Sequence, residues 1–135
     1  MTYLRKILAL VLLLTGVLAF SSCYTLKFNP NNDAIRILVI CKGDNLSLNE
    51  AVNESDALKI TEILNGKHLY KDNPSCGFTE KQAIVIHDNK TFCIAMDECP
   101  ILYYKEEDKY LRLSEEEYNQ LLQIIEQYGF VKLGY

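Results

Sequence analysis

The sequence predicts an α+β domain, an antiparallel sheet of four to five strands with two helices packed on one face. Three observations support this prediction. Short β-rich segments separated by turn residues fill residues 82–113, an amphipathic helical pattern with capping signals follows at 114–129, and a second helical pattern lies at 56–65. Helices that flank a run of antiparallel strands are typical of this class.

The chain begins with the three-part pattern of an export signal over residues 1–22. Two basic residues precede an apolar run of 14 residues, Ile7–Phe20, and two serines follow it. The apolar run is shorter than the about 20 residues that a membrane-spanning helix needs. We therefore expect a signal peptide, with an uncleaved anchor helix as the alternative.

The end of this segment, Phe20-Ser21-Ser22-Cys23, resembles a bacterial lipobox, in which the cysteine is lipidated and becomes the new N-terminus. Leu is usual three residues before that cysteine, and here the residue is Phe. A cut after Ser21, at the small-x-small site Ala19-Phe20-Ser21, is the alternative and gives a secreted protein. We expect a lipid anchor at Cys23, which places the protein in the bacterial envelope outside the cytoplasm, since two or more lipid signals anchor stably.

The mature chain divides into a polar spacer at 23–33 and a single domain at 34–135. The first predicted strand, Ala34–Cys41, has apolar residues on both faces, which favours a central position in the sheet. Ser47–Glu50 fits a capping box, and a later start at Asn53 or Ser55 is the alternative. The helix itself is predicted from about Asp56 to Asn65, and its apolar stripe is Ala57, Ile60, Ile63 and Leu64.

Two strands on either side of residue 88 predict a hairpin. Ile84 and Ile86 share the core face with Phe92 and Ile94 if three residues, 88–90, form the loop. In that register Ile86 pairs with Phe92.

A further hairpin with the charged tip Lys105–Lys109 leads to a last strand, Tyr110–Leu113. The final helix has the strongest local signals, because Ser114 and Glu117 form a capping box and the three glutamates after Ser114 favour the positive end of the helix dipole. Its predicted buried stripe is Tyr118, Leu121, Leu122, Ile125 and Tyr128.

Charge and motifs exclude several classes of function. Removal of residues 1–22 leaves 12 basic and 18 acidic residues, a net charge of −6, which argues against nucleic acid as a partner. No phosphate loop, dinucleotide fingerprint, zinc-protease motif, nucleophile elbow or Cys-x-x-Cys is present, so the sequence predicts no cofactor.

Four cysteines follow Cys23: Cys41, Cys76, Cys93 and Cys99. An even number in an exported domain permits two disulfides, and buried free thiols are the alternative. Cys93 and Cys99 flank one turn, where a third ligand such as Cys76 or a histidine would complete a metal site.

Nine tyrosines are the main oddity of the composition. Tyr110 and Arg112 share the sheet face opposite Leu111, and Tyr103 or Tyr104 joins them. If the helices cover the other face, these side chains lie on an open one, where tyrosine often marks an interface. We take Tyr103, Tyr110 and Arg112 as the candidate binding face, with simple amphipathic packing as the alternative.

The C-terminal half also carries a resemblance. Cys76-Gly77-Phe78, IVIHDNKTFCIAMDECPILYY, KYLRLSEEE and the final QYGF resemble small exported bacterial proteins of no assigned activity, over residues 76–130. The resemblance implies an exported protein and transfers no catalytic residue.

These observations favour a membrane-tethered module that binds a protein partner outside the cytoplasm, for example as an inhibitor. One alternative is a thiol- or metal-dependent enzyme that uses Cys76, Cys93 and Cys99 with a histidine. Another is a structural envelope lipoprotein.

Overall fold

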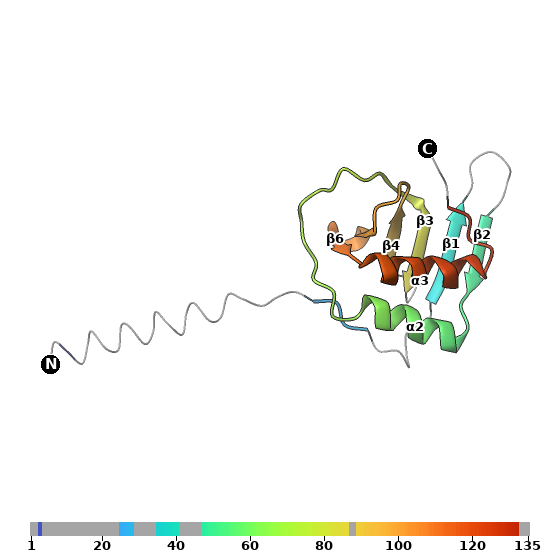
Figure 1. Cartoon of the computed structure of the whole chain (residues 1–135), viewed down its shortest axis with the longest axis horizontal. Helices are drawn as coiled ribbons and strands as arrows, with labels where there is room; N and C mark the ends of the chain where they lie inside the picture. The colour runs from blue at the N-terminus through green and yellow to red at the C-terminus, as the bar shows by residue number, and fades with distance from the viewer. Residues whose placement is uncertain (1–2, 4–24, 29–34, 41–46, 87–88, 133–135) are drawn as a thin grey trace.

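The computed structural model describes residues 3, 25–28, 35–40, 47–86 and 89–132. Six antiparallel strands form one sheet in the order β2-β1-β3-β4-β5-β6, and helices α2 and α3 lie side by side on one face of it (Figure 1). The predicted α+β class, with both helices on one side, is confirmed.

The first half of the domain contains β1 (Ile35–Ile40), β2 (Ser47–Ala51) and α2 (Glu54–Leu64). The capping box expected at the start of β2 is wrong, because these residues pair with β1 and form an edge strand. Asn53 caps α2 instead, and its side-chain oxygen accepts a hydrogen bond from the Asp56 N–H at 2.8 Å. This additional strand raises the sheet from the expected four or five strands to six.

Strands β3 (Phe78–Ile86) and β4 (Lys90–Ala95) form the central hairpin. Ile84 pairs with Phe92, and Ile86 pairs with Lys90. The predicted pairing of Ile86 with Phe92 is therefore wrong, although the shared core face is confirmed, because a shift of two residues keeps every side chain on its own face. Residue 88 of the expected loop lies outside the described residues, and Lys90 already belongs to β4.

The second hairpin consists of β5 (Ile101–Tyr104), a single 3₁₀ turn η1 (Lys105–Glu107) and β6 (Lys109–Arg112). The charged tip is mostly exposed, as expected, and its carboxylates have local partners. Glu106 accepts a hydrogen bond from the Thr91 N–H at 2.7 Å, and Asp108 accepts one from the Tyr103 hydroxyl at 3.1 Å. The tip therefore folds back against β4 and β5.

Helix α3 (Glu115–Glu126) begins as the sequence predicts. The Ser114 hydroxyl accepts a hydrogen bond from the Glu117 N–H at 3.1 Å, and the Glu117 carboxylate accepts one from the Ser114 N–H at 2.9 Å. This reciprocal pair is the expected capping box. Gly129 follows the helix with φ of +89°, a conformation that glycine adopts without strain.

The main core lies between the helices and the sheet, and we call it the helix-face core. It consists of these buried side chains: Leu26, Phe28, Ala57, Ile60, Ile63, Leu64, Leu69, Ile84, Ile86, Phe92, Ile94, Leu102, Tyr104, Leu111, Leu113, Tyr118, Leu121, Ile124, Ile125 and Phe130. The whole predicted stripe of α2 is buried. On α3, Ile124 is buried in addition to the predicted residues, while Leu122 and Tyr128 lie at the edge.

The expected spacer at 23–33 is wrong for the part that the structure describes. Leu26 and Phe28 are only 6% and 8% exposed and belong to the helix-face core. Thr25 forms a β-bridge with His68, four residues after the end of α2. The chain thus joins the folded domain two residues after Cys23.

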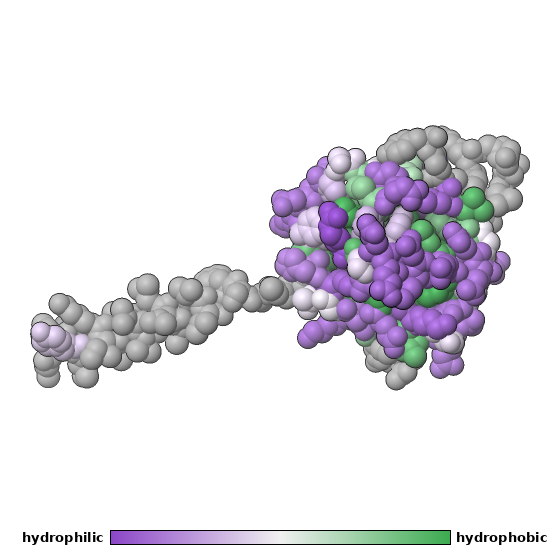
Figure 2. Space-filling view, in the orientation of Figure 1, coloured by the Kyte–Doolittle hydropathy of each residue, from purple (hydrophilic) through white to green (hydrophobic). Residues whose placement is uncertain are grey.

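No helix in the described ranges is both long and apolar enough to cross a membrane. Apart from Tyr3, the predicted signal peptide lies outside those ranges, and so does Cys23. On the folded domain, hydrophilic side chains cover most of the surface that α2 and α3 present (Figure 2).

Candidate functional site: the groove between the two helices

The predicted binding face on the far side of the sheet is covered at Tyr110. Tyr103 and Tyr110 are cross-strand neighbours, as alternation predicts, with ring centroids 5.1 Å apart. Phe78 packs against both rings, and Tyr70 forms a β-bridge and a ring contact with Tyr110. Tyr110 is consequently only 9% exposed, so the expectation of an open face is wrong at this residue.

We call this second group the loop-face cluster, and it consists of Tyr70, Cys76, Phe78, Ala95, Cys99, Ile101, Tyr103 and Tyr110. Asn73, in the loop before β3, accepts a hydrogen bond from the Tyr110 hydroxyl at 3.0 Å. Of the three predicted residues, Arg112 is exposed, Tyr103 is half-buried and Tyr110 is buried. The loop before β3 covers the centre of the predicted site at Tyr110.

The three described cysteines after Cys23 form one disulfide and one buried free thiol. Cys76 and Cys99 form a disulfide that joins the loop to the start of β5. Burial raises the pKa of the Cys93 thiol to about 12, so this side chain stays protonated and is a poor nucleophile at neutral pH. Cys41 lies outside the described residues.

One group of described residues approaches the geometry of a metal site. Cys76, Asp97 and Cys99 place their ligand atoms within 4.8 Å of one another. The two sulfurs are bonded to each other, so they are available as thiolate ligands only after reduction. No histidine of the described ranges joins the group, and His87 lies outside those ranges. The structure does not bring together the three thiols and histidine of the enzyme hypothesis.

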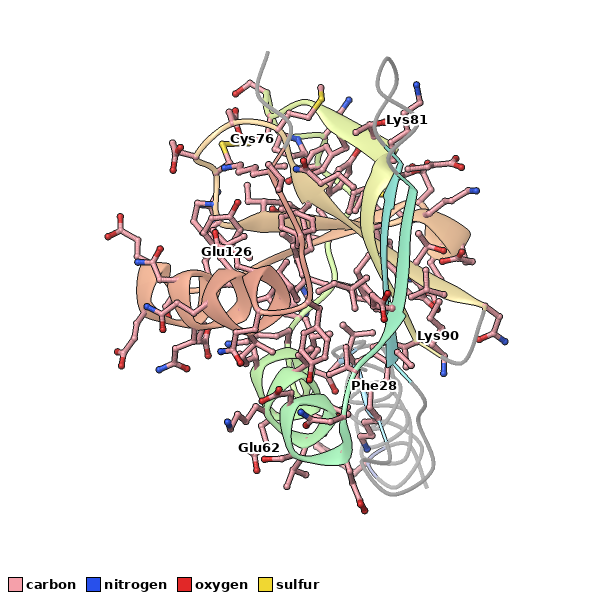
Figure 3. The ribbon with its side chains drawn as sticks, turned by 90° about the vertical axis from the view of Figure 1, so that its right-hand side faces the viewer. Phe28, Glu62, Cys76, Lys81, Lys90 and Glu126 are labelled. Atoms are coloured by element: carbon pink, nitrogen blue, oxygen red, sulfur yellow. A yellow bond between two sulfur atoms is a disulfide. The ribbon has the colours of Figure 1, made fainter. Side chains whose placement is uncertain are left out.

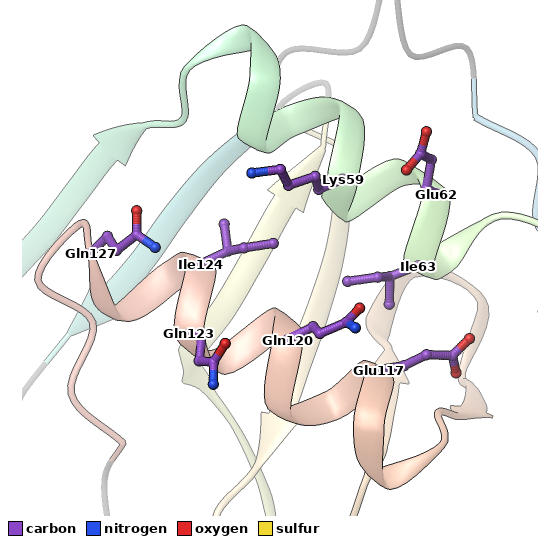
Figure 4. Close-up of a pocket in the computed structure, with 8 residues that line it drawn as sticks. All are labelled: Lys59, Glu62, Ile63, Glu117, Gln120, Gln123, Ile124 and Gln127. Carbon is purple, nitrogen blue, oxygen red and sulfur yellow. The ribbon is translucent and has the colours of Figure 1, made fainter.

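A hollow on the described surface lies instead between α2 and α3, and this groove has a volume of about 460 Å³. Its lining consists of Lys59, Glu62 and Ile63 from α2, and Glu117, Gln120, Gln123, Ile124 and Gln127 from α3 and its C-terminal end. Figure 4 shows Gln120, Ile124 and Gln127 on the side of α3 that faces α2, opposite Lys59 and Ile63.

The floor of the groove is apolar and its rim carries amides. Ile63 and Ile124 are 8% and 7% exposed, because they close the top of the helix-face core. Gln120, Gln123 and Gln127 are exposed at a spacing of three and four residues, which places them along one side of the helix. Each amide supplies both hydrogen-bond donors and an acceptor.

One end of the groove is closed by an ion pair. The Lys67 ammonium lies 2.6 and 2.7 Å from the two oxygens of the Glu117 carboxylate. This contact, together with the Ser114 N–H, holds the pKa of Glu117 below its usual range. Glu117 therefore stays ionised and links the start of α3 to Lys67, in the segment after α2.

The other end is fixed by a polar network. The Tyr128 hydroxyl donates to Asp56 at 2.6 Å and accepts from the Asn53 N–H at 3.1 Å. The hydrogen bond from Tyr128 is the largest cause of a lowered pKa at Asp56, which also lies 3.3 Å from Lys59. The two helices are consequently held to each other at both ends of the groove.

This groove was not predicted from the sequence. The spacing of Gln120, Gln123 and Gln127 is visible beside the apolar stripe of α3, and this pattern is the signal that was available. These three glutamines line a groove only because α2 lies opposite them in the folded chain.

Comparison with known proteins gives no relative from which a functional role can be transferred. No family model, curated protein or solved structure matches this chain. The assignments above therefore come from the residues themselves.

Proposed function

We propose that the protein is a lipid-anchored binding module of the bacterial envelope, facing outside the cytoplasm, and that its helix groove holds an extended segment of a protein partner. The observation that carries this proposal is the chemistry of the groove, an apolar floor with a row of amides along one side. The export signal and the Cys23 lipobox support the location.

Two of the three charged side chains that line the groove have ionic partners, which favours a largely neutral ligand. Lys59 has a carboxylate neighbour in Asp56, and Glu117 is paired with Lys67. A ligand held mainly by charge would need these groups to leave their partners. Amides that donate and accept match the alternating N–H and C=O groups of a peptide backbone instead.

The dimensions also fit a peptide. Gln120 and Gln127 are seven residues apart on α3 and on its C-terminal end, a rise of about 10 Å along a helix, which equals about three residues of extended chain. Ile63 and Ile124 would contact apolar side chains of the bound segment, while the amides bind its backbone.

The test uses the full-length protein, extracted from membranes, and a displayed library of random peptides. We expect selected peptides to lose about tenfold in affinity for the double variant Gln120→Ala/Gln127→Ala, because a hydrogen bond contributes about 1 kcal/mol. The matched control is Asn119→Ala, an exposed amide of α3 that does not line the groove.

Failure to select any peptide above background would contradict the proposal, as would equal losses in the double variant and the Asn119→Ala control. Intact mass of the same membrane extract tests the anchor, since the expected mature protein begins at Cys23 and carries acyl chains. A protein that begins at Ser22 without lipid would contradict the anchoring.

A further inference from the structure

The residues that follow the predicted anchor are part of the folded domain. The Leu26 N–H donates to the Lys67 carbonyl at 3.1 Å, and the Gly66 N–H donates to the Leu26 carbonyl at 2.9 Å. With the bridge between Thr25 and His68, these contacts attach residues 25–28 to the chain that leaves the C-terminal end of α2. We call residues 25–28 the docked segment.

The last residue of the docked segment is held on both sides. The Asn65 side chain accepts a hydrogen bond from the Phe28 N–H at 2.6 Å and donates one to the Phe28 carbonyl at 3.3 Å. The Phe28 ring meets Phe92 edge-on at 5.8 Å, and the Lys90 ammonium lies 5.6 Å from the ring centre (Figure 3). The segment is therefore fixed by hydrogen bonds and by burial.

The length of free chain between the anchor and the domain is very short. Two residue steps separate Cys23 from Thr25, and two steps of fully extended chain reach at most about 7 Å. An acyl anchor at Cys23 consequently keeps Thr25 at the headgroup layer of the membrane.

We propose that the end of the domain formed by the docked segment and residues 65–68 rests on the membrane surface, so that the anchor fixes the orientation of the domain. This inference rests on the proposed lipid anchor. This end of the domain offers two lysines, because Lys27 is exposed and Lys90 lies over Phe28. Such side chains suit the phosphates of lipid headgroups.

The orientation decides how a partner reaches the groove. Lys67 connects the two sites, because its carbonyl holds Leu26 and its ammonium holds Glu117. The Glu117 end of the groove therefore lies toward the membrane, and the opposite end, near Lys59 and Gln127, lies away from it. A partner segment enters from the end that is distant from the membrane.

The test compares two positions at opposite ends of α2, a helix of 11 residues and so about 16 Å long. A fluorescent amino acid replaces either exposed His68, beside the docked segment, or exposed Ser55, in the first turn of α2. The full-length lipidated protein is placed in vesicles of phosphatidylethanolamine and phosphatidylglycerol that carry a quencher on their headgroups. We expect about threefold stronger quenching at position 68 than at position 55.

A flexible Gly/Ser insertion between residues 24 and 25 is the matched variant. It lies before the docked segment, so thermal unfolding is expected to be unchanged, and the quenching at the two positions is expected to become equal. Equal quenching in the uninserted protein, while it still floats with the vesicles, would overturn the orientation and leave the anchor intact. Failure of the protein to float with the vesicles, or unchanged flotation of Cys23→Ser, would instead overturn the proposed anchor.

Discussion

The two faces of the sheet are closed by different means. Twenty buried hydrophobic residues of the described chain form the helix-face core, whereas four form the buried part of the loop-face cluster. The helices bury a regular stripe, because their side chains return to the same side every three or four residues. The loop has no such period, and a disulfide, ring contacts and the hydrogen bond from Tyr110 to Asn73 hold it in place.

The comparison shows which face depends on apolar burial and which depends on cross-links. Substitutions that remove volume should have their largest effect under the helices. Removal of the Cys76–Cys99 disulfide should mainly destabilise the loop before β3. Four predictions test this difference.

The largest effect is expected for Phe92→Ala in the helix-face core. Phe92 is fully buried and stacks on Tyr104 with ring centroids 4.6 Å apart. We expect the free energy of unfolding to fall by about 4 kcal/mol, because the substitution leaves a large cavity. Urea unfolding measures the loss, with the half-buried neighbour Thr91→Ala as control. A loss below about 1 kcal/mol would show that burial under the helices is not the main source of stability.

The second effect concerns the loop face. We expect the free energy of unfolding of the double variant Cys76→Ala/Cys99→Ala to fall by about 3 kcal/mol, because the disulfide joins two residues that are 23 positions apart in the sequence. Limited proteolysis should cut the loop before β3 faster, and a reductant should have the same effect on the wild type. Cys93→Ala removes a thiol without a cross-link and is the control. Unchanged stability and cleavage in the double variant would contradict the role of the disulfide.

A smaller effect is expected where a hydroxyl links the two helices. Tyr128→Phe removes the hydrogen bond to Asp56, and we expect it to lower the free energy of unfolding by about 1 kcal/mol. The pKa of Asp56 should then rise toward its usual value of 3.8, because Tyr128 is the main cause of its depression.

The sign of the pH dependence follows from that depression. A carboxyl whose pKa is lowered by folding stabilises the protein above its unfolded pKa, and this contribution is lost as the pH falls through the folded value. In Tyr128→Phe we expect less loss of stability on acidification below about pH 4. NMR titration of Asp56 in both proteins measures the shift, and an identical pKa in the two would contradict the assignment.

The smallest effect is expected for one hydroxyl on each face. Tyr118 belongs to the helix-face core and Tyr70 to the loop-face cluster, and within the described chain neither buried hydroxyl makes a hydrogen bond of normal geometry, although the Lys132 ammonium lies near Tyr118. We expect Tyr118→Phe and Tyr70→Phe to leave stability within about 0.5 kcal/mol of the wild type or to raise it. Thermal unfolding measures both, and a clear loss in either would reveal a partner for that hydroxyl.

The sequence predicted the parts of the fold that carry a local signal. The capping box at Ser114 and Glu117, the stripe of α2 and the shared face of Ile84 and Phe92 depend on residues close in the chain or on strict alternation. The wrong pairing of Ile86 shows the limit of alternation, because a shift of two residues preserves every face. β2 escaped prediction because an edge strand needs little apolar periodicity, and its polar residues also fit a helix cap.

The candidate site was harder to predict from the sequence than the fold. Alternation correctly placed Tyr103, Tyr110 and Arg112 on the face opposite Leu111, but no local pattern indicates that a loop more than thirty residues earlier covers Tyr110. The groove forms only when α2 and α3 meet in the folded chain. Lys67 and Glu117, which close one end of it, are fifty residues apart in the sequence.

By itself, the sequence determined the class of the fold, the start of α3 and the expectation of an exported, lipid-anchored protein, because each depends on neighbouring residues. Only the tertiary structure decided that Cys76 bonds to Cys99, that the loop closes the far face and that residues 25–28 are docked. Those outcomes arise from contacts between segments distant in the chain, whose energies depend on which surfaces meet. Cys23 and Thr25 are two residues apart in the sequence, but this short spacing limits the position of the domain only because residues 25–28 pack against it.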